Sequence, residues 1–86
     1  MDFDNFFNWL TTEKKFSKRS ASDAVSRLRR ALIILDTKNI DLTSLEELNS
    51  SPKFNNCSKF VKSQLRRTIS LYNEFCTIQN FRKVEI

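Results

Sequence analysis

The chain of 86 residues contains no glycine and only one proline, Pro52. Tight hairpin turns depend on positive φ angles, which glycine adopts at the lowest cost. Without glycine, turns and helix ends depend on Asn, Asp, Ser and Pro52, and this composition favours helices over hairpins. A chain this short forms one domain with a core only just large enough to fold alone. We therefore expect a single all-α domain over residues 1–86.

Apolar residues recur at helical spacing in the first half of the chain. Phe3, Phe6, Phe7 and Leu10 follow the i, i+3, i+4, i+7 pattern of an apolar helix face, with Asp2 as a candidate N-cap and Trp9 at the edge of the face. A longer stripe follows, made up of Ala21, Ala24, Val25, Leu28, Ala31, Leu32 and Leu35. Either Ser17 or Ser20 is placed to cap that second helix. These patterns predict helices over 3–14 and 20–35.

The second half predicts one short helix and one long helix. Thr43 and Glu46 have the spacing of a capping box, and Leu42, Leu45 and Leu48 supply an apolar side. Pro52 ends this helix, and a loop leads to a stripe formed by Val61, Leu65, Thr68, Ile69, Tyr72 and Cys76. We predict helices over 43–49 and 58–79, followed by a tail in which Phe81 docks back. The expected fold is a compact bundle of four to five helices.

A five-residue phrase occurs twice, once in each long helix. Ser26-Arg27-Leu28-Arg29-Arg30 is matched by Ser63-Gln64-Leu65-Arg66-Arg67. The net charge is +5, and the basic residues are concentrated around these phrases. Residues 14–30 contain seven basic side chains and one acidic side chain, and residues 53–67 contain five basic side chains and no acidic one. Segregated positive charge on two helices indicates an anionic partner. The alternative, that both arginine pairs are simply solvated side chains on helix surfaces with no ligand, stays open.

Several kinds of chemistry lack their usual residues. The chain has no histidine and only two cysteines, Cys57 and Cys76, which we expect to be reduced thiols, with Cys76 in the core. Without glycine there is no phosphate-binding glycine-rich loop, and no nucleophile has a histidine base beside it. We therefore expect no catalytic residues, no metal site and no cofactor. No secretion signal or membrane-spanning run is present, so we expect a cytoplasmic protein.

Three groups of residues resemble a known DNA-binding domain. They are Phe6-x-x-Trp9-Leu10, Phe16-Ser17-x-x-Ser20-Ala21, and Leu28-Arg29-Arg30 with Leu35. Together they resemble the SAM-like core-binding domain of phage integrases and other tyrosine recombinases, over residues 3–78. This chain has Ala24 where that family often has Tyr. It also lacks the histidine of the separate catalytic domain, and its single tyrosine, Tyr72, lies on the inner stripe. The resemblance implies a stand-alone relative that binds DNA without cleaving it.

In that family the second and fourth helices cross the DNA and contact its backbone and major groove. Carried over by position, the resemblance implies nucleic-acid contacts from Lys18, Arg19, Ser20, Ser26, Arg27, Arg30, Lys59, Lys62, Ser63, Arg66 and Arg67. The phenylalanines are expected on inner stripes, so we expect duplex DNA rather than stacking on a single strand. RNA stays open on charge alone. An alternative is a protein-docking module or inhibitor that acts through four apolar residues off the main stripes, which are Ile33, Ile34, Phe60 and Leu71.

Overall fold

The structure, a computed structural model, describes the backbone of residues 2–84 and the side chains of residues 2–79. Within that range it consists of five α-helices: α1 (Phe3–Thr12), α2 (Lys18–Leu35), α3 (Ser44–Asn49), α4 (Pro52–Asn55) and α5 (Lys59–Val84). The prediction of an all-α bundle of four to five helices is confirmed. Helix α5 continues beyond residue 79, the end that was expected. The predicted docking of Phe81 lies outside the described side chains.

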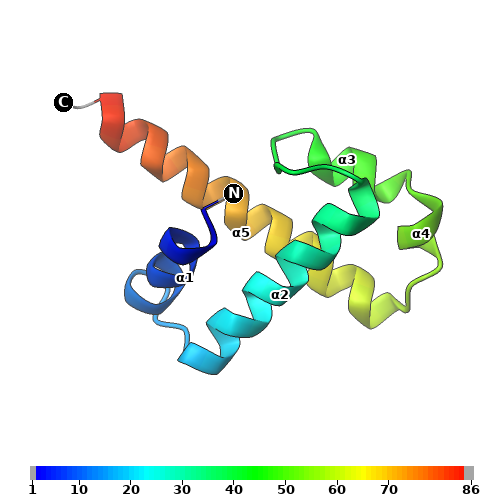
Figure 1. Ribbon diagram of the computed structural model, residues 1–86, viewed down its shortest axis with the longest axis horizontal. Helices are drawn as coiled ribbons and strands as arrows, with labels where there is room; N and C mark the ends of the chain where they lie inside the picture. The colour runs from blue at the N-terminus through cyan, green and yellow to red at the C-terminus, as the bar shows by residue number, and fades with distance from the viewer. Residues whose placement is uncertain (1, 85–86) are drawn as a thin grey trace.

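The two long helices, α2 and α5, pack on each other; α1 and α3 contact both of them, and α4 packs on α3. In Figure 1 α5 runs diagonally through the molecule, and α2 crosses it near the centre. Helix α1 lies against both α2 and α5, and α3 and α4 lie on the opposite side of the crossing point from α1. The molecule measures 42 × 27 × 17 Å. Because it is thin, much of the surface of α2 and α5 remains open to solvent.

Aromatic rings from α1 and α5 form the centre of the core. The ring of Phe6 lies 5.2 Å from that of Tyr72 and 5.6 Å from that of Phe75 between centroids. Trp9 belongs to this cluster and is only 4% exposed, so the expectation that it lies at the edge of the apolar face is wrong. Both α2 and α5 contact α1, and two neighbours bury a wider strip of a helix than one neighbour does.

Helix α2 begins at Lys18 because Ser17 caps it. The Ser17 hydroxyl oxygen accepts a hydrogen bond from the Ser20 backbone N–H at 3.1 Å. This decides between the two candidate caps and starts the helix two residues earlier than predicted. The turns on either side of α2 show the consequence of having no glycine. Lys15, with φ 56°, and Asp36, with φ 52°, take up the left-handed conformation in its place.

The predicted capping box at the start of α3 is wrong. The Thr43 hydroxyl makes no capping bond; it donates to the Asp41 carboxylate at 2.6 Å and also lies 3.1 Å from Glu47 Oε1. Asp41 accepts a second bond from the Thr43 backbone N–H, and these hydrogen bonds hold the pKa of its carboxyl below the ordinary value. Leu42, expected on the apolar side of α3, is 80% exposed. An Asx-type turn therefore leads into this helix.

Two further differences concern α4 and the cysteines. Helix α4 occupies residues predicted to form a loop, with Pro52 in its first turn, where the missing N–H costs no hydrogen bond. It buries Phe54 completely. Both cysteines are free thiols and half-buried, so Cys76 packs against the core without being enclosed in it.

Candidate nucleic-acid interface

A groove between α2 and α5 brings together residues from both copies of the repeated phrase. Ser20 and Arg27 line it from α2, and Ser63 and Arg67 line it from α5, around a volume of about 520 Å³. Ser20 and Arg27 are seven residues apart, which is close to two helical turns, and Ser63 and Arg67 are four apart. Each pair therefore projects from one face of its helix, and the crossing of α2 and α5 makes the two faces neighbours.

The arginines of the groove have no ion-pair partner among the described residues. Among the described side chains, the only ion pair is Lys14–Glu74 at 2.6 Å, which lies elsewhere. Neither Arg27 nor Arg67 donates a hydrogen bond to any residue within 2–79. Asp23 is the one acidic residue among those lining the groove. Two guanidinium groups against one carboxylate leave the groove with a positive charge.

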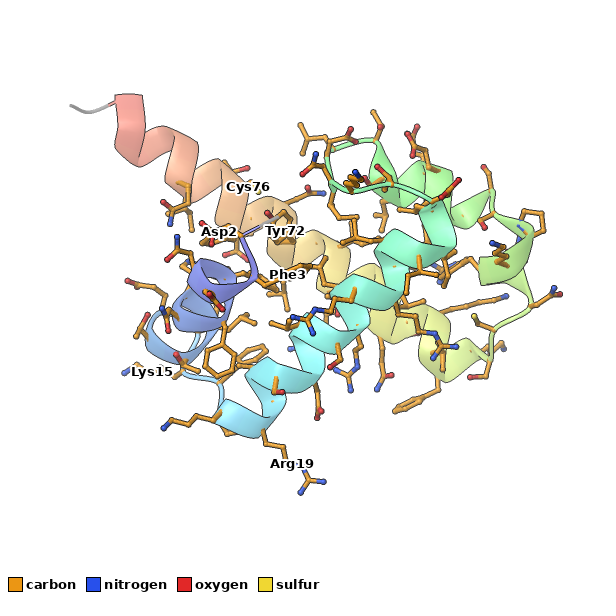
Figure 2. All side chains as sticks on the ribbon, viewed as in Figure 1. Asp2, Phe3, Lys15, Arg19, Tyr72 and Cys76 are labelled. Carbon is orange, nitrogen blue, oxygen red and sulfur yellow. The ribbon has the colours of Figure 1, made fainter. Side chains whose placement is uncertain are left out.

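Further cations lie outside the groove. Arg19, Arg30 and Lys59 are exposed, and Figure 2 shows Arg19 pointing away from the body of the molecule. At about 100° per residue, Arg19 and Arg30 lie roughly 60–80° around α2 from Arg27, on its solvent side. Lys59 begins α5, next to the groove. These side chains extend the positive surface beyond the groove.

Lys18 and Ser26 are also exposed but sit farther from the groove. By the same helical geometry Ser26 lies about 100° from Arg27, and Lys18 about 180°, on the opposite side of α2. Of the residues predicted on α2, the structure thus places Ser20 and Arg27 in the groove, Arg19, Ser26 and Arg30 beside it, and Lys18 away from it.

Two of the residues predicted on α5 are engaged with α3 and α4. The Arg66 guanidinium lies 5.1 Å from the Phe54 ring centroid, and its Nε donates to Asn49 Oδ1 at 3.0 Å. The Lys62 ammonium lies 5.9 Å from the same ring. Both side chains cover the buried Phe54, and cations over an aromatic face are attracted to it. Lys62 and Arg66 therefore have structural contacts that Arg67 does not have.

The sequence predicted Phe60 off the main apolar stripes but did not place it with the arginines. Phe60 lines the groove together with Arg67 and is 71% exposed. The signal was present in the spacing: seven residues separate Phe60 from Arg67, so the two lie within about 20° on the helix. Phe16, from the segment before α2, is half-buried at the same groove.

The four apolar residues considered for protein docking do not form one surface. Phe60 and Leu71 line the groove, and Leu71 is partly buried against the core. Ile33 is 72% exposed and borders a separate shallow hollow at the end of α2, while Ile34 packs against the core. A partner that contacted all four would have to reach more than one side of the molecule.

No helix over residues 2–84 has both the length and the apolar character required to cross a membrane. No cluster of three or more Cys, Asp or Glu side chains able to hold a metal ion occurs among the described residues. Comparison with known protein families, with curated proteins and with solved structures found no match.

Proposed function

We propose that this chain is a small, non-enzymatic nucleic-acid-binding module that holds duplex DNA through α2 and α5. The observation that carries the proposal is that Arg27 and Arg67 come from different helices to one groove, and neither has an ion-pair partner among the described residues. The resemblance to the core-binding domain of tyrosine recombinases supports the same two helices as the DNA contacts.

The binding would be mainly electrostatic. An arginine can donate two parallel hydrogen bonds to a phosphate, which fixes its position as well as attracting it. Five cations are available for this: Arg19, Arg30, Lys59 and Arg67 are exposed, and Arg27 is half-buried at the groove. If each neutralises one phosphate, the affinity falls with salt at a log–log slope of about −4.5. Contacts of this kind position a protein on DNA without reading its sequence.

The test is fluorescence anisotropy with a labelled random duplex of about 25 base pairs, titrated from about 50 to 300 mM salt. The decisive variant is Arg27→Glu/Arg67→Glu. Its matched control is Lys38→Glu/Lys53→Glu, which changes the net charge by the same amount at exposed positions outside the groove lining. Circular dichroism establishes that both variants remain helical. We expect the groove variant to lose binding and the control to keep most of it. Equal losses of affinity in the two variants would mean that net charge alone explains the effect. Absence of DNA binding by the unaltered protein would refute the proposal.

Protein docking is a second proposal, favoured by the exposure of Phe60 and Ile33. It ranks behind DNA binding because these two side chains border different hollows. A docking protein would depend on these apolar residues and would tolerate the double charge reversal in the groove. Pull-down with the unaltered protein and with Arg27→Glu/Arg67→Glu separates the two proposals: retention of one partner by both would favour docking.

A further inference from the structure

Phe60 differs from the other exposed apolar side chains in what surrounds it. Large hydrophobic residues exposed in the described part of the chain are Ile33, Leu42 and Phe60. Single exposed apolar side chains are ordinary on protein surfaces and need no explanation. Phe60, however, is the only aromatic one, and it lines the groove that holds Arg27 and Arg67. A flat apolar ring therefore lies beside two guanidinium groups that have no ion-pair partner among the described residues, in a groove whose one carboxylate is that of Asp23.

This combination fits the chemistry of a nucleotide. The phosphate of a nucleotide pairs with guanidinium groups, and its base stacks on an aromatic ring. The groove volume of about 520 Å³ lies within the range of pockets for small organic ligands, and is much larger than a phosphate alone requires. Polar groups that could approach a base edge are also present, because Ser63 and Gln64 line the same groove.

A paired base cannot offer its face to such a ring. Within a duplex both faces of each base are covered by stacking, and only the edges are accessible in the grooves. An aromatic side chain therefore stacks on a base that is unpaired or has been turned out of the helix. The cations outside the groove, Arg19, Arg30 and Lys59, remain available for the flanking backbone.

We propose that the α2–α5 groove accepts one unpaired nucleotide, with its base on Phe60 and its phosphate between Arg27 and Arg67. This inference rests on the proposed function and specifies its substrate class: nucleic acid that carries an unpaired base within or beside a duplex. Stacking on one aromatic ring contributes about 1–3 kcal/mol per base. The corresponding preference over a fully paired duplex is roughly 5- to 150-fold in affinity.

The experiment compares two labelled probes of equal sequence, a perfect duplex and the same duplex with one extra unpaired nucleotide in its centre. Dissociation constants are measured by anisotropy for the unaltered protein, for Phe60→Leu and for the control Ile33→Ala. Leucine keeps an apolar side chain at position 60 but removes the ring. The control alters a side chain of nearly equal exposure, at 72% against 71%, outside the groove.

We expect the bulged duplex to bind at least about fivefold more tightly than the perfect one. The preference should disappear in Phe60→Leu and persist in Ile33→Ala. A bulge also makes DNA easier to bend, and this could produce a preference without stacking. A preference that persists in Phe60→Leu would therefore overturn the inference. Equal affinity of the unaltered protein for both probes would also overturn it. Binding of the perfect duplex tests the proposed function separately, and failure to bind either probe would refute both.

Discussion

The adjacent residues Arg66 and Arg67 provide a sharp test, because the structure gives them different roles. The Arg66 side chain donates to Asn49 and lies over the ring of Phe54, whereas Arg67 lines the α2–α5 groove without a described partner. Both are exposed, on the same helix, and identical in charge. Arg66→Ala and Arg67→Ala therefore change the same side chain in two neighbouring settings. We expect the first to lower stability and the second to lower affinity for DNA.

The magnitude for Arg66 follows from its two contacts. A hydrogen bond contributes about 0.5–1.5 kcal/mol net, and solvent exposure places this one in the lower half of that range. A cation over an aromatic ring at an exposed site adds about 0.5–1 kcal/mol. Arg66→Ala should thus lower the free energy of unfolding by about 1–2 kcal/mol. Arg67→Ala loses neither contact, so its effect on stability should stay within about 0.5 kcal/mol.

Urea denaturation measures the first effect and anisotropy with duplex DNA the second. For a small domain with a slope near 1.5 kcal/mol per molar urea, Arg66→Ala moves the midpoint down by about 1 M. Arg67→Ala leaves the midpoint in place and weakens DNA binding more than Arg66→Ala does. Equal midpoints for the two variants would contradict these roles, and so would a folded Arg66→Ala that weakened DNA binding as much as Arg67→Ala.

Two further predictions concern stability alone. Ser17→Ala removes the cap of α2 and should cost about 1 kcal/mol in urea denaturation, whereas Ser22→Ala, an exposed position inside the same helix, should cost nothing. Burial, together with the neighbouring Cys76, raises the pKa of Tyr72 from 10.0 to about 12; the two residues lie together beside Asp2 in Figure 2. Tyr72 is neutral in both states below pH 10, but between pH 10 and 12 mainly the unfolded chain loses its proton, so stability falls over this range by an amount on the order of 2 kcal/mol. The Tyr72→Phe variant should not show this loss of stability at alkaline pH. If the unfolding free energies of the variant and the unaltered protein ran parallel from pH 9 to 11.5, the raised pKa of Tyr72 would be contradicted.

The two long helices were predictable because their apolar stripes are long and regular. Leu28 and Leu65, at the centres of these stripes, are both buried. The errors lie where tertiary contacts or side-chain hydrogen bonds decide the outcome. Trp9 is buried because a second helix packs against α1, which no local pattern reveals. The start of α3 follows from the bonding of Asp41, whose short side chain competes with the expected cap.

The candidate site was predictable only in part, for a related reason. Helical spacing is enough to place Ser20 with Arg27, and Ser63 with Arg67, on common faces. It does not say which face of one helix meets which face of another. Arg66 is engaged by Asn49, at the end of α3, and by Phe54 of α4, whose four residues were predicted as a loop. The exposure of Phe60 depends on the same packing, because a helix this long presents some of its apolar residues to no neighbour.

The structure gives the leucine and both members of the arginine pair in the repeated phrase a role, which would not be expected if the arginine pairs were only solvated side chains that occur twice by chance. In each copy the leucine is buried, and the first member of the adjacent arginine pair lies over a phenylalanine: Arg29 is 4.8 Å from the Phe3 ring centroid, and Arg66 is 5.1 Å from that of Phe54. Successive residues turn by about 100°, so a helix that packs beside the leucine stripe meets the first arginine and leaves the second to solvent. Helix α1 takes that place beside α2, and in α5 the ring that Arg66 covers comes from Phe54 of α4. The phrase therefore encodes a packing unit in which a leucine fills the core, one arginine covers a ring, and the other, Arg30 or Arg67, remains available for a ligand.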